Sequence, residues 1–262
     1  MWTRLGAVIV LLGLAQAARA ESPAVAPESP RTTLRVLAYN IHHGAGNDEK
    51  LDLLRIARLI RSLAPDVVAL QEVDERTERT GGVDQAAELG RLTGMAWAFG
   101  PFMDYQGGRY GMAVLSALPF ASSTNHRLPE GSEPRSSLAI RIELPGGAGE
   151  LTFAGIHFYR TAEERKAQAT RLLDVLDLSG LAILAGDFNS TPDSEVMGLI
   201  ARAFVIPDKG DDRLTFRSDR PDREIDFIVA RPVERITVVE SRVIDEPVAS
   251  DHRPVFLVVE VR

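Results

Sequence analysis

Short runs of apolar residues recur along most of the chain and end in polar or turn residues. Val67 to Leu70 and Leu181 to Ala185 are unbroken apolar stretches, which are typical of strands buried on both faces. The same kind of pattern predicts further strands at 34–39, 111–116, 137–144, 151–156, 226–230, 236–243 and 255–261. We therefore expect a strand-rich protein with a large buried core.

Helical periodicity interrupts these strands at four places. Between Leu51 and Leu63, apolar residues stand at positions 53, 56, 59, 60 and 63, which predicts an amphipathic helix. Asp84 and Thr161 have side chains that cap helix N-termini, so we expect helices from Asp84 to about Thr93 and over 162–176. A short helix is predicted at 194–202.

The order of these elements bears on the fold class. Strands alternate with helices early in the chain, whereas strands dominate its last third, and this mixture favours stacked sheets with helices outside, an α/β (α+β) fold. A doubly wound parallel sheet fits less well, because too few crossover helices are available for it. The chain has 262 residues and is 45% hydrophobic, which is enough for one large domain over residues 34–262.

The N-terminus has a different character. Arg4 precedes an apolar run from Leu5 to Leu14, and the small residues around Ala20 resemble a signal-peptide cleavage site. The run is too short to span a bilayer. We expect residues 1–20 to be a cleaved signal peptide and residues 21–33 a disordered lead-in, so that the mature protein is secreted or periplasmic and has no transmembrane segment.

Composition narrows the classes of function. The absence of cysteine excludes disulfides and a thiol nucleophile. The chain has 30 basic and 37 acidic residues, and losing Arg4 and Arg19 with the signal peptide would change the net charge from −7 to −9. Because non-specific nucleic-acid binding depends on neutralising phosphates, this charge counts against a nuclease that tracks long DNA.

Polar residues that could bind a metal or transfer a proton lie where the predicted strands end. Carboxylates, amides and imidazoles in such positions supply the hard oxygen donors and proton carriers that a metal-dependent phosphoester hydrolase requires. These residues are Asn40, Glu72, His157, Asp187, Asn189, Asp226, Asp251 and His252.

Taken in order, the motifs around these residues resemble the endonuclease/exonuclease/phosphatase superfamily, which includes DNase-I-like nucleases, neutral sphingomyelinases and inositol-polyphosphate 5-phosphatases. The resemblance runs from about Leu34 to Val261 and implies a four-layer α/β sandwich, with two face-to-face mixed sheets between helical layers and a site across the strand ends. Its motifs are Tyr39-Asn40, Leu70-Gln71-Glu72, Gly186-Asp187-Phe188-Asn189, Ile225-Asp226 and Ser250-Asp251-His252-Arg253-Pro254-Val255.

The resemblance also implies roles for these residues. Glu72 is the expected principal Mg²⁺ carboxylate, with Asn40 and Asp251 as further residues around the metal; Mn²⁺ is an alternative ion. His252 is the expected base that activates the attacking water, and Asp226 orients its ring. Asp187 and Asn189 are expected to position the nucleophile and contact phosphoryl oxygens, and His157 to donate to the phosphate or the leaving group.

Four further features have two interpretations each. The segment from Arg109 to Ser116 resembles a family segment, so Arg109 or Tyr110 could contact phosphate, although Met112 replaces a usual Asn. Arg135 is either a phosphate clamp or a structural ion pair. The adjacent His42 and His43 suggest a transition metal or an exposed loop. The basic loop is either a grip for a polyanionic headgroup or a solvated loop balanced by nearby acids; it comprises Arg213, Arg217, Arg220 and Arg223.

The sequence thus predicts a monomeric, Mg²⁺-dependent phosphoester hydrolase that uses a metal- and histidine-activated water. It leaves the substrate open among nucleic acids, phospholipid headgroups and sugar or inositol phosphates, and does not separate a monoesterase from a diesterase. One alternative is a secreted endonuclease or exonuclease acting on DNA or RNA. Another is a catalytically silent binding module of the same fold, which the presence of Glu72 and His252 disfavours.

Overall fold

The computed structural model describes residues 32–262. The predicted signal peptide and residues 21–31 of the predicted lead-in lie outside the described residues. Thr32 and Thr33, expected in the lead-in, instead open the first strand, β1 (Thr32–Asn40). Within residues 32–262, no helix is long and apolar enough to cross a membrane.

Two mixed β-sheets form the centre of the molecule. The six-stranded sheet has the order β10-β11-β1-β2-β4-β3, and the five-stranded sheet has the order β5-β6-β7-β8-β9. Only β1–β2 and β7–β8 pair in parallel among these neighbours. The remaining strands are β2 (Val67–Glu75), β3 (Ala96–Tyr105), β4 (Gly108–Ser116), β5 (Phe120–Arg127), β6 (Ser136–Glu143), β7 (Glu150–His157), β8 (Leu181–Asp187), β9 (Asp226–Arg231), β10 (Ile236–Val243) and β11 (Val255–Val261).

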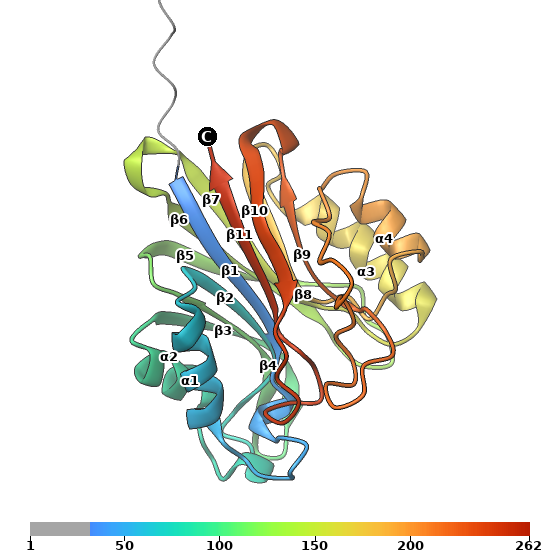
Figure 1. Cartoon of the computed structure of the whole chain (residues 1–262). Helices are drawn as coiled ribbons and strands as arrows, with labels where there is room; N and C mark the ends of the chain where they lie inside the picture. The colour runs from blue at the N-terminus through green and yellow to red at the C-terminus, as the bar shows by residue number, and fades with distance from the viewer. Residues whose placement is uncertain (1–31) are drawn as a thin grey trace, which may run out of the picture.

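Helices cover the outer faces of both sheets, which gives the four-layer sandwich expected from the sequence. Helices α1 (Leu53–Leu63) and α2 (Gln85–Thr93) lie on the six-stranded side, and α3 (Ala162–Val175) and α4 (Glu195–Ile200) lie on the five-stranded side (Figure 1). Buried apolar side chains such as Val36, Phe153 and Ile183 fill the space between the sheets. Short 3₁₀ turns complete the fold at η1 (His42–Gly44), η2 (Glu78–Thr80), η3 (Pro145–Gly147) and η4 (Val233–Arg235).

Helices α1, α2 and α3 each begin directly after the residue that caps them. Asp84 accepts a hydrogen bond from the Ala87 amide at 3.1 Å, and the Thr161 hydroxyl accepts one from the Glu164 amide at 3.4 Å, as their side chains predict. The first helix begins at Leu53 because the Asp52 carboxylate accepts from the Arg55 amide at 2.9 Å and caps it there.

Two edge strands, β3 and β5, have no counterpart among the predicted elements. Strand β5 is mostly exposed and has the polar sequence Ser122-Ser123-Thr124-Asn125 in its middle, so no apolar pattern marks it. Strand β3 contains Pro101 next to an irregularity in its pairing with β4, and proline is tolerated in a sheet at edges and bulges. Both strands are defined by backbone pairing to a neighbour rather than by their own hydrophobic pattern.

Candidate active site

The predicted site residues converge at one end of the two sheets, because the parallel pairs bring successive strand ends together. Asn40 ends β1 beside Gln71 of β2, and His157 ends β7 beside Asp187 of β8. Asp226 begins β9 opposite Asp187. A cleft of about 790 Å³ opens here, and the predicted residues that line it are Glu72, Tyr110, Arg135, His157, Asp187, Asn189, Asp251 and His252.

Three buried side chains form what we call the acid–base cluster: Asp187, Asp226 and His252. The Nδ1 atom of His252 lies 3.0 and 3.2 Å from the two carboxylate oxygens of Asp226, and its Nε2 atom lies 3.8 Å from Asp187 Oδ2. Because a carboxylate only accepts, Nδ1 carries a proton and the ring orientation is fixed by Asp226. Phe216 packs at 4.7 Å from the His252 ring centre and limits its movement further.

The electrostatics of this cluster favour holding protons. Burial raises the pKa of Asp187 to about 7, and the neighbouring Asp226 carboxylate reinforces the shift. Burial alone lowers the pKa of His252, but the charges of Asp226 and Asp187 outweigh it and raise the pKa to about 10. The cluster therefore contains a carboxyl group with a pKa of about 7 beside a histidine that stays protonated at that pH.

His157 and Asn189 both contact the Asp187 carboxylate. His157 Nε2 lies 3.5 Å from Asp187 Oδ2, and its Nδ1 atom is buried with no hydrogen-bond partner in residues 32–262. Burial lowers the pKa of His157 well below its usual range, with Arg135 and His252 adding to the effect. The backbone amide of Asn189 donates to Asp187 Oδ1 at 2.8 Å, while its side-chain amide donates to a main-chain carbonyl. Because its pKa is lowered, His157 is neutral near pH 7.

Asn40 connects the acid–base cluster to Glu72. The Nδ2 atom of this buried side chain donates to Glu72 Oε1 at 3.1 Å and to Asp187 Oδ2 at 3.3 Å. Its Oδ1 atom accepts from the His42 amide at 3.1 Å. The Ser250 hydroxyl donates to the Asn40 carbonyl at 2.7 Å, which ties the loop holding Asp251 to the end of β1.

Glu72 projects into the cleft from an irregular position in β2. Its pairing with β4 slips between Gln71 and Val73, and Glu72 has a left-handed backbone with φ of 57°. A glutamate in this conformation is strained, and such strain is retained where the surrounding structure holds it in place. The bulge turns the carboxylate toward Asn40 rather than into the ladder of the sheet.

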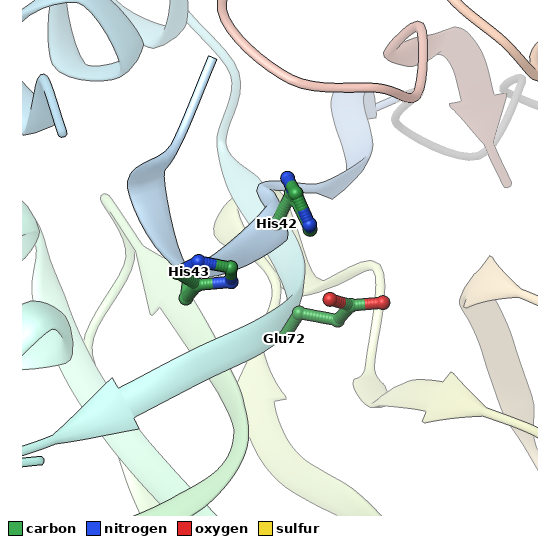
Figure 2. A group of neighbouring side chains, drawn as sticks. All are labelled: His42, His43 and Glu72. Carbon is green, nitrogen blue, oxygen red and sulfur yellow. The ribbon is translucent and has the colours of Figure 1, made fainter. Parts of the chain in front are cut away.

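The turn η1 places two imidazoles beside the same carboxylate. Figure 2 shows His42 above the Glu72 carboxylate and His43 next to it on the same turn. One ligand atom from each of His42, His43 and Glu72 lies within 4.8 Å of the others. We call these three residues the histidine cluster. Burial lowers the pKa of His43 to about 4, so its ring is neutral.

A cationic and aromatic wall faces the carboxylates across the cleft. The Arg135 guanidinium is buried, pairs with Glu133, and stacks at 5.0 Å from the Phe102 ring centre and 5.2 Å from that of Tyr159. Arg135 thus forms the predicted ion pair and also lines the cleft, while its role as a phosphate clamp stays a prediction. Tyr110 also lines the cleft, and burial raises its pKa well above the usual range.

Several lining residues were not predicted from the sequence. They come from the loop before α3 and the first turn of that helix, from the loop after β8 and from the segment preceding β9, where the residue pattern resembles that of an ordinary solvated loop. They include Tyr159, Arg160, Arg165, Phe216 and Ile225. Only their position in the folded chain marks them as part of the cleft.

Arg109 does not join the cleft. Its guanidinium pairs with the Glu75 carboxylate, with an Nη2–Oε1 distance of 2.8 Å, and it lines a separate depression. In the basic loop, Arg217 and Arg220 lie 3.6 and 3.5 Å from Asp219. This loop is therefore mostly a solvated, charge-balanced loop, and of its four arginines only Arg223 lines the cleft.

Comparisons with known proteins find similar sequences and similar folds. A sequence profile described as the Endonuclease/Exonuclease/phosphatase family matches residues 37–252. A 142-residue segment, 53% of the chain, is 28% identical to protein cwh43 of Schizosaccharomyces pombe and spans 14% of that protein.

Solved structures share the fold over most of the chain. An endonuclease/exonuclease/phosphatase from Beutenbergia cavernae has a TM-score of 0.71 and 26% identity, over 87% of this chain and 72% of that chain. A mannosyl-6-phosphatase of Bacteroides thetaiotaomicron has a TM-score of 0.70 and 17% identity, over 86% of this chain and 99% of that chain.

Proposed function

The chain belongs to the endonuclease/exonuclease/phosphatase family, and we propose that it is a divalent-metal-dependent hydrolase of small phosphoesters. Family membership supports phosphoester hydrolysis as the general chemistry. The observation that supports the proposal most strongly is the buried Asp226–His252 pair, whose Nε2 atom faces Asp187 and Asn40 beside the Glu72 carboxylate. This arrangement combines proton carriers with oxygen ligands in one cleft.

The donor set fits a hard divalent cation. Glu72, Asp187, Asp226 and Asp251 place four carboxylates in or beneath one cleft. Burial raises the pKa of Asp187, and repulsion from Asp226 and Glu72 adds to the shift. Mg²⁺ prefers oxygen ligands and needs one or two carboxylates besides substrate and water. Glu72 and Asp251 would hold the ion, with Asn40 adding an amide oxygen after reorientation of its side chain. When bound, the cation would neutralise phosphoryl charge and acidify the attacking water.

The other side chains of the cleft would transfer protons and stabilise developing charge. Asp226 fixes the His252 ring, so Nε2 points to the space above Asp187 where a phosphoryl oxygen or a water would lie. The resemblance implies that His252 is the base, whereas a pKa of about 10 keeps its ring protonated near pH 7. The Asp187 pKa of about 7 supports this carboxylate as the proton acceptor instead, with protonated His252 donating to the phosphoryl group. Neutral His157 and buried Arg135 would stabilise charge that develops on the leaving side.

The walls of the cleft support one class of substrate over the others. Four arginines line it in a chain whose net charge is −7, which favours a compact anion over a long polyanion: Arg135, Arg160, Arg165 and Arg223. The volume of about 790 Å³ suits a phosphorylated small molecule or headgroup. The similarity in fold to a mannosyl-6-phosphatase is compatible with a sugar phosphate.

A substrate panel tests this proposal. Purified protein would be assayed with sugar phosphates, inositol phosphates, sphingomyelin, phosphatidylinositol, bis-phosphodiester reporters, RNA and plasmid DNA, each with Mg²⁺, Mn²⁺ or EDTA. We expect cation-dependent phosphate release or diester cleavage from a small substrate and little action on plasmid DNA. Turnover that persists in EDTA would contradict the metal requirement, and activity confined to nucleic acids would replace the proposed substrate with that of a nuclease.

We also propose that the protein acts outside the cytoplasm, on the basis of the N-terminal pattern alone. Mass spectrometry of the protein purified from its native host would give the mature N-terminus. Cleavage after Ala20 would leave Glu21 first and support export. An intact N-terminus in the cytosolic fraction would contradict it.

A further inference from the structure

We propose that the histidine cluster, His42, His43 and Glu72, is a binding site for a nitrogen-preferring transition-metal dication of the Zn²⁺ class. Two imidazoles and one carboxylate are a ligand set used by zinc sites that keep an open position. The site is separate in its ligands from the acid–base cluster and shares only Glu72 with the expected Mg²⁺ ligands. The inference concerns metal binding, so it holds whether or not the protein hydrolyses phosphoesters.

The spacing of the three ligand atoms supports a metal. They lie within 4.8 Å of one another, and ligand atoms around a Zn²⁺ ion at about 2.0–2.3 Å from the metal lie about 3–4 Å apart. Small side-chain rotations would therefore close the site. The ring centres of His42 and His43 are 4.5 Å apart and inclined at 64°, so the rings are edge-to-face rather than stacked flat. Figure 2 shows the two rings on one turn and Glu72 on the adjacent strand.

The hydrogen bonds leave ring nitrogens free for this role. His42 Nδ1 lies 3.2 Å from the Ala45 carbonyl oxygen, and because that oxygen only accepts, Nδ1 carries the proton and Nε2 keeps its lone pair. This is the outer-shell contact that commonly fixes a metal-binding histidine. His43 Nδ1 is buried and has no hydrogen-bond partner within residues 32–262. An unpaired buried imidazole nitrogen is costly, and a metal that fixed the ring would compensate for it.

The backbone holds the three ligands in place. His42, His43 and Glu72 all have left-handed conformations, with φ of 45°, 44° and 57°. Non-glycine residues rarely adopt this conformation, and such positions gather at functional sites. The Gln85 side chain anchors the turn by donating to the His43 carbonyl at 2.7 Å, and a separate 3.1 Å bond joins the Ile41 amide to the Gln71 carbonyl. The histidine turn and the Glu72 bulge are therefore fixed to one another.

The chemistry of the donors selects the ion. Imidazole nitrogen suits Zn²⁺, Co²⁺ and Ni²⁺, whereas Mg²⁺ prefers oxygen. Glu72 Oε1 accepts from Asn40, while a carboxylate has a second oxygen that can face the imidazoles. The site would thus take up a transition metal next to the cleft, and its occupancy would be coupled to that of the oxygen-lined site through Glu72.

Cobalt binding tests the inference directly. Metal-free full-length protein would be titrated with Co²⁺ while its visible absorption is recorded, and Zn²⁺ would then be added as a competitor. His42→Asn and His43→Asn each remove one imidazole, and asparagine tolerates the left-handed backbone. His126→Asn is the matched control, because His126 lies on β5 outside both clusters. Circular dichroism melts would confirm that each variant folds.

We expect wild-type protein and His126→Asn to give the same imidazole-type Co²⁺ spectrum and to lose it to Zn²⁺. Each of the other two variants should weaken Co²⁺ and Zn²⁺ binding at least about tenfold, since altering even residues behind the ligands costs that much. Wild-type protein that binds neither ion, or folded His42→Asn and His43→Asn that both bind as wild type does, would overturn the inference. If Mg²⁺-dependent turnover persisted in that case, only this inference would fail and the proposed function would stand.

Discussion

The two clusters that meet at Asn40 differ in how complete they are. In the acid–base cluster, the side chains of Asp187, Asp226 and His252 are 2%, 3% and 6% exposed, and each has a charged partner in the cluster. In the histidine cluster, His42, His43 and Glu72 are half-buried, have strained backbones and include an unpaired ring nitrogen. The first cluster is organised without any ligand, whereas the second has unsatisfied ligand atoms.

This difference predicts separate tasks for the two clusters. Each charge of a buried ion pair needs a partner, because an isolated buried charge is costly. The Asp226–His252 pair meets that requirement. A cation site differs, because its ligand atoms have a partner only when the ion is bound. We therefore expect Glu72 to control cation binding, and Asp226 and His252 to control proton transfer.

The largest effect is expected from Glu72→Gln, which keeps the size of the side chain but removes the charge that holds the cation. Turnover should fall about 10³-fold or more, because the bound cation contributes several kcal/mol to the transition state. Steady-state kinetics over a range of Mg²⁺ concentrations would measure it. Glu75→Gln is the matched control on the same strand, since Glu75 pairs with Arg109 outside the cleft. Equal losses in both variants would contradict a specific role for Glu72.

The acid–base cluster should respond differently to substitution. His252→Asn should lower kcat about 10²–10⁴-fold, the usual contribution of a positioned acid or base. Because Asp226 acts through His252, the double variant with Asp226→Asn should be about as slow as His252→Asn alone. A double-mutant cycle in kcat would measure this. Fully additive losses would mean that Asp226 has a separate task.

A smaller effect is expected at the cationic wall. Arg135→Lys keeps the charge but loses the planar fork, so KM should rise about tenfold, the equivalent of one charge-assisted hydrogen bond. Arg109→Lys should leave KM unchanged, because its guanidinium pairs with Glu75 outside the cleft. Initial rates against substrate concentration separate the two. A rise in KM for both variants would contradict the placement of Arg109.

The smallest effect concerns the pH dependence of stability in the metal-free protein. Asp187 has a folded pKa of about 7 against 3.8 for the free side chain, so its stabilising contribution is present below about pH 4 and is lost as pH rises through 7. Asp187→Asn should therefore gain stability relative to wild type as pH rises over that range. Thermal melts in EDTA would measure the difference, and an Asp187→Asn Tm that tracks wild type at every pH would contradict the raised pKa.

Much of this fold was predictable because its central strands contain unbroken apolar runs and its helices have clear caps such as Asp84. Strands β3 and β5 were not, since an edge strand is defined by pairing with its neighbour and not by burial of its own residues. The same limit applies to Glu72, whose left-handed backbone arises from a slip in the β2–β4 ladder that no local pattern records.

The candidate site was predictable to the extent that strand ends and motifs mark it. Asn40, Glu72, Asp187, Asp226 and His252 all meet in the folded chain, as their positions at strand ends suggested. Arg109 differs because its position beside Tyr110 in a family-like segment says nothing of side-chain direction. On a strand, neighbouring side chains point to opposite faces, so Tyr110 faces the cleft and Arg109 faces Glu75.

The central claim is that cation binding and proton transfer belong to different residues of one cleft. Mn²⁺ binding followed by electron paramagnetic resonance, on wild type, Glu72→Gln and His252→Asn without substrate, tests it most directly. We predict that His252→Asn binds Mn²⁺ within about threefold of wild type, while Glu72→Gln loses at least about tenfold in affinity. Equal weakening in both variants, or unchanged binding in Glu72→Gln, would contradict it.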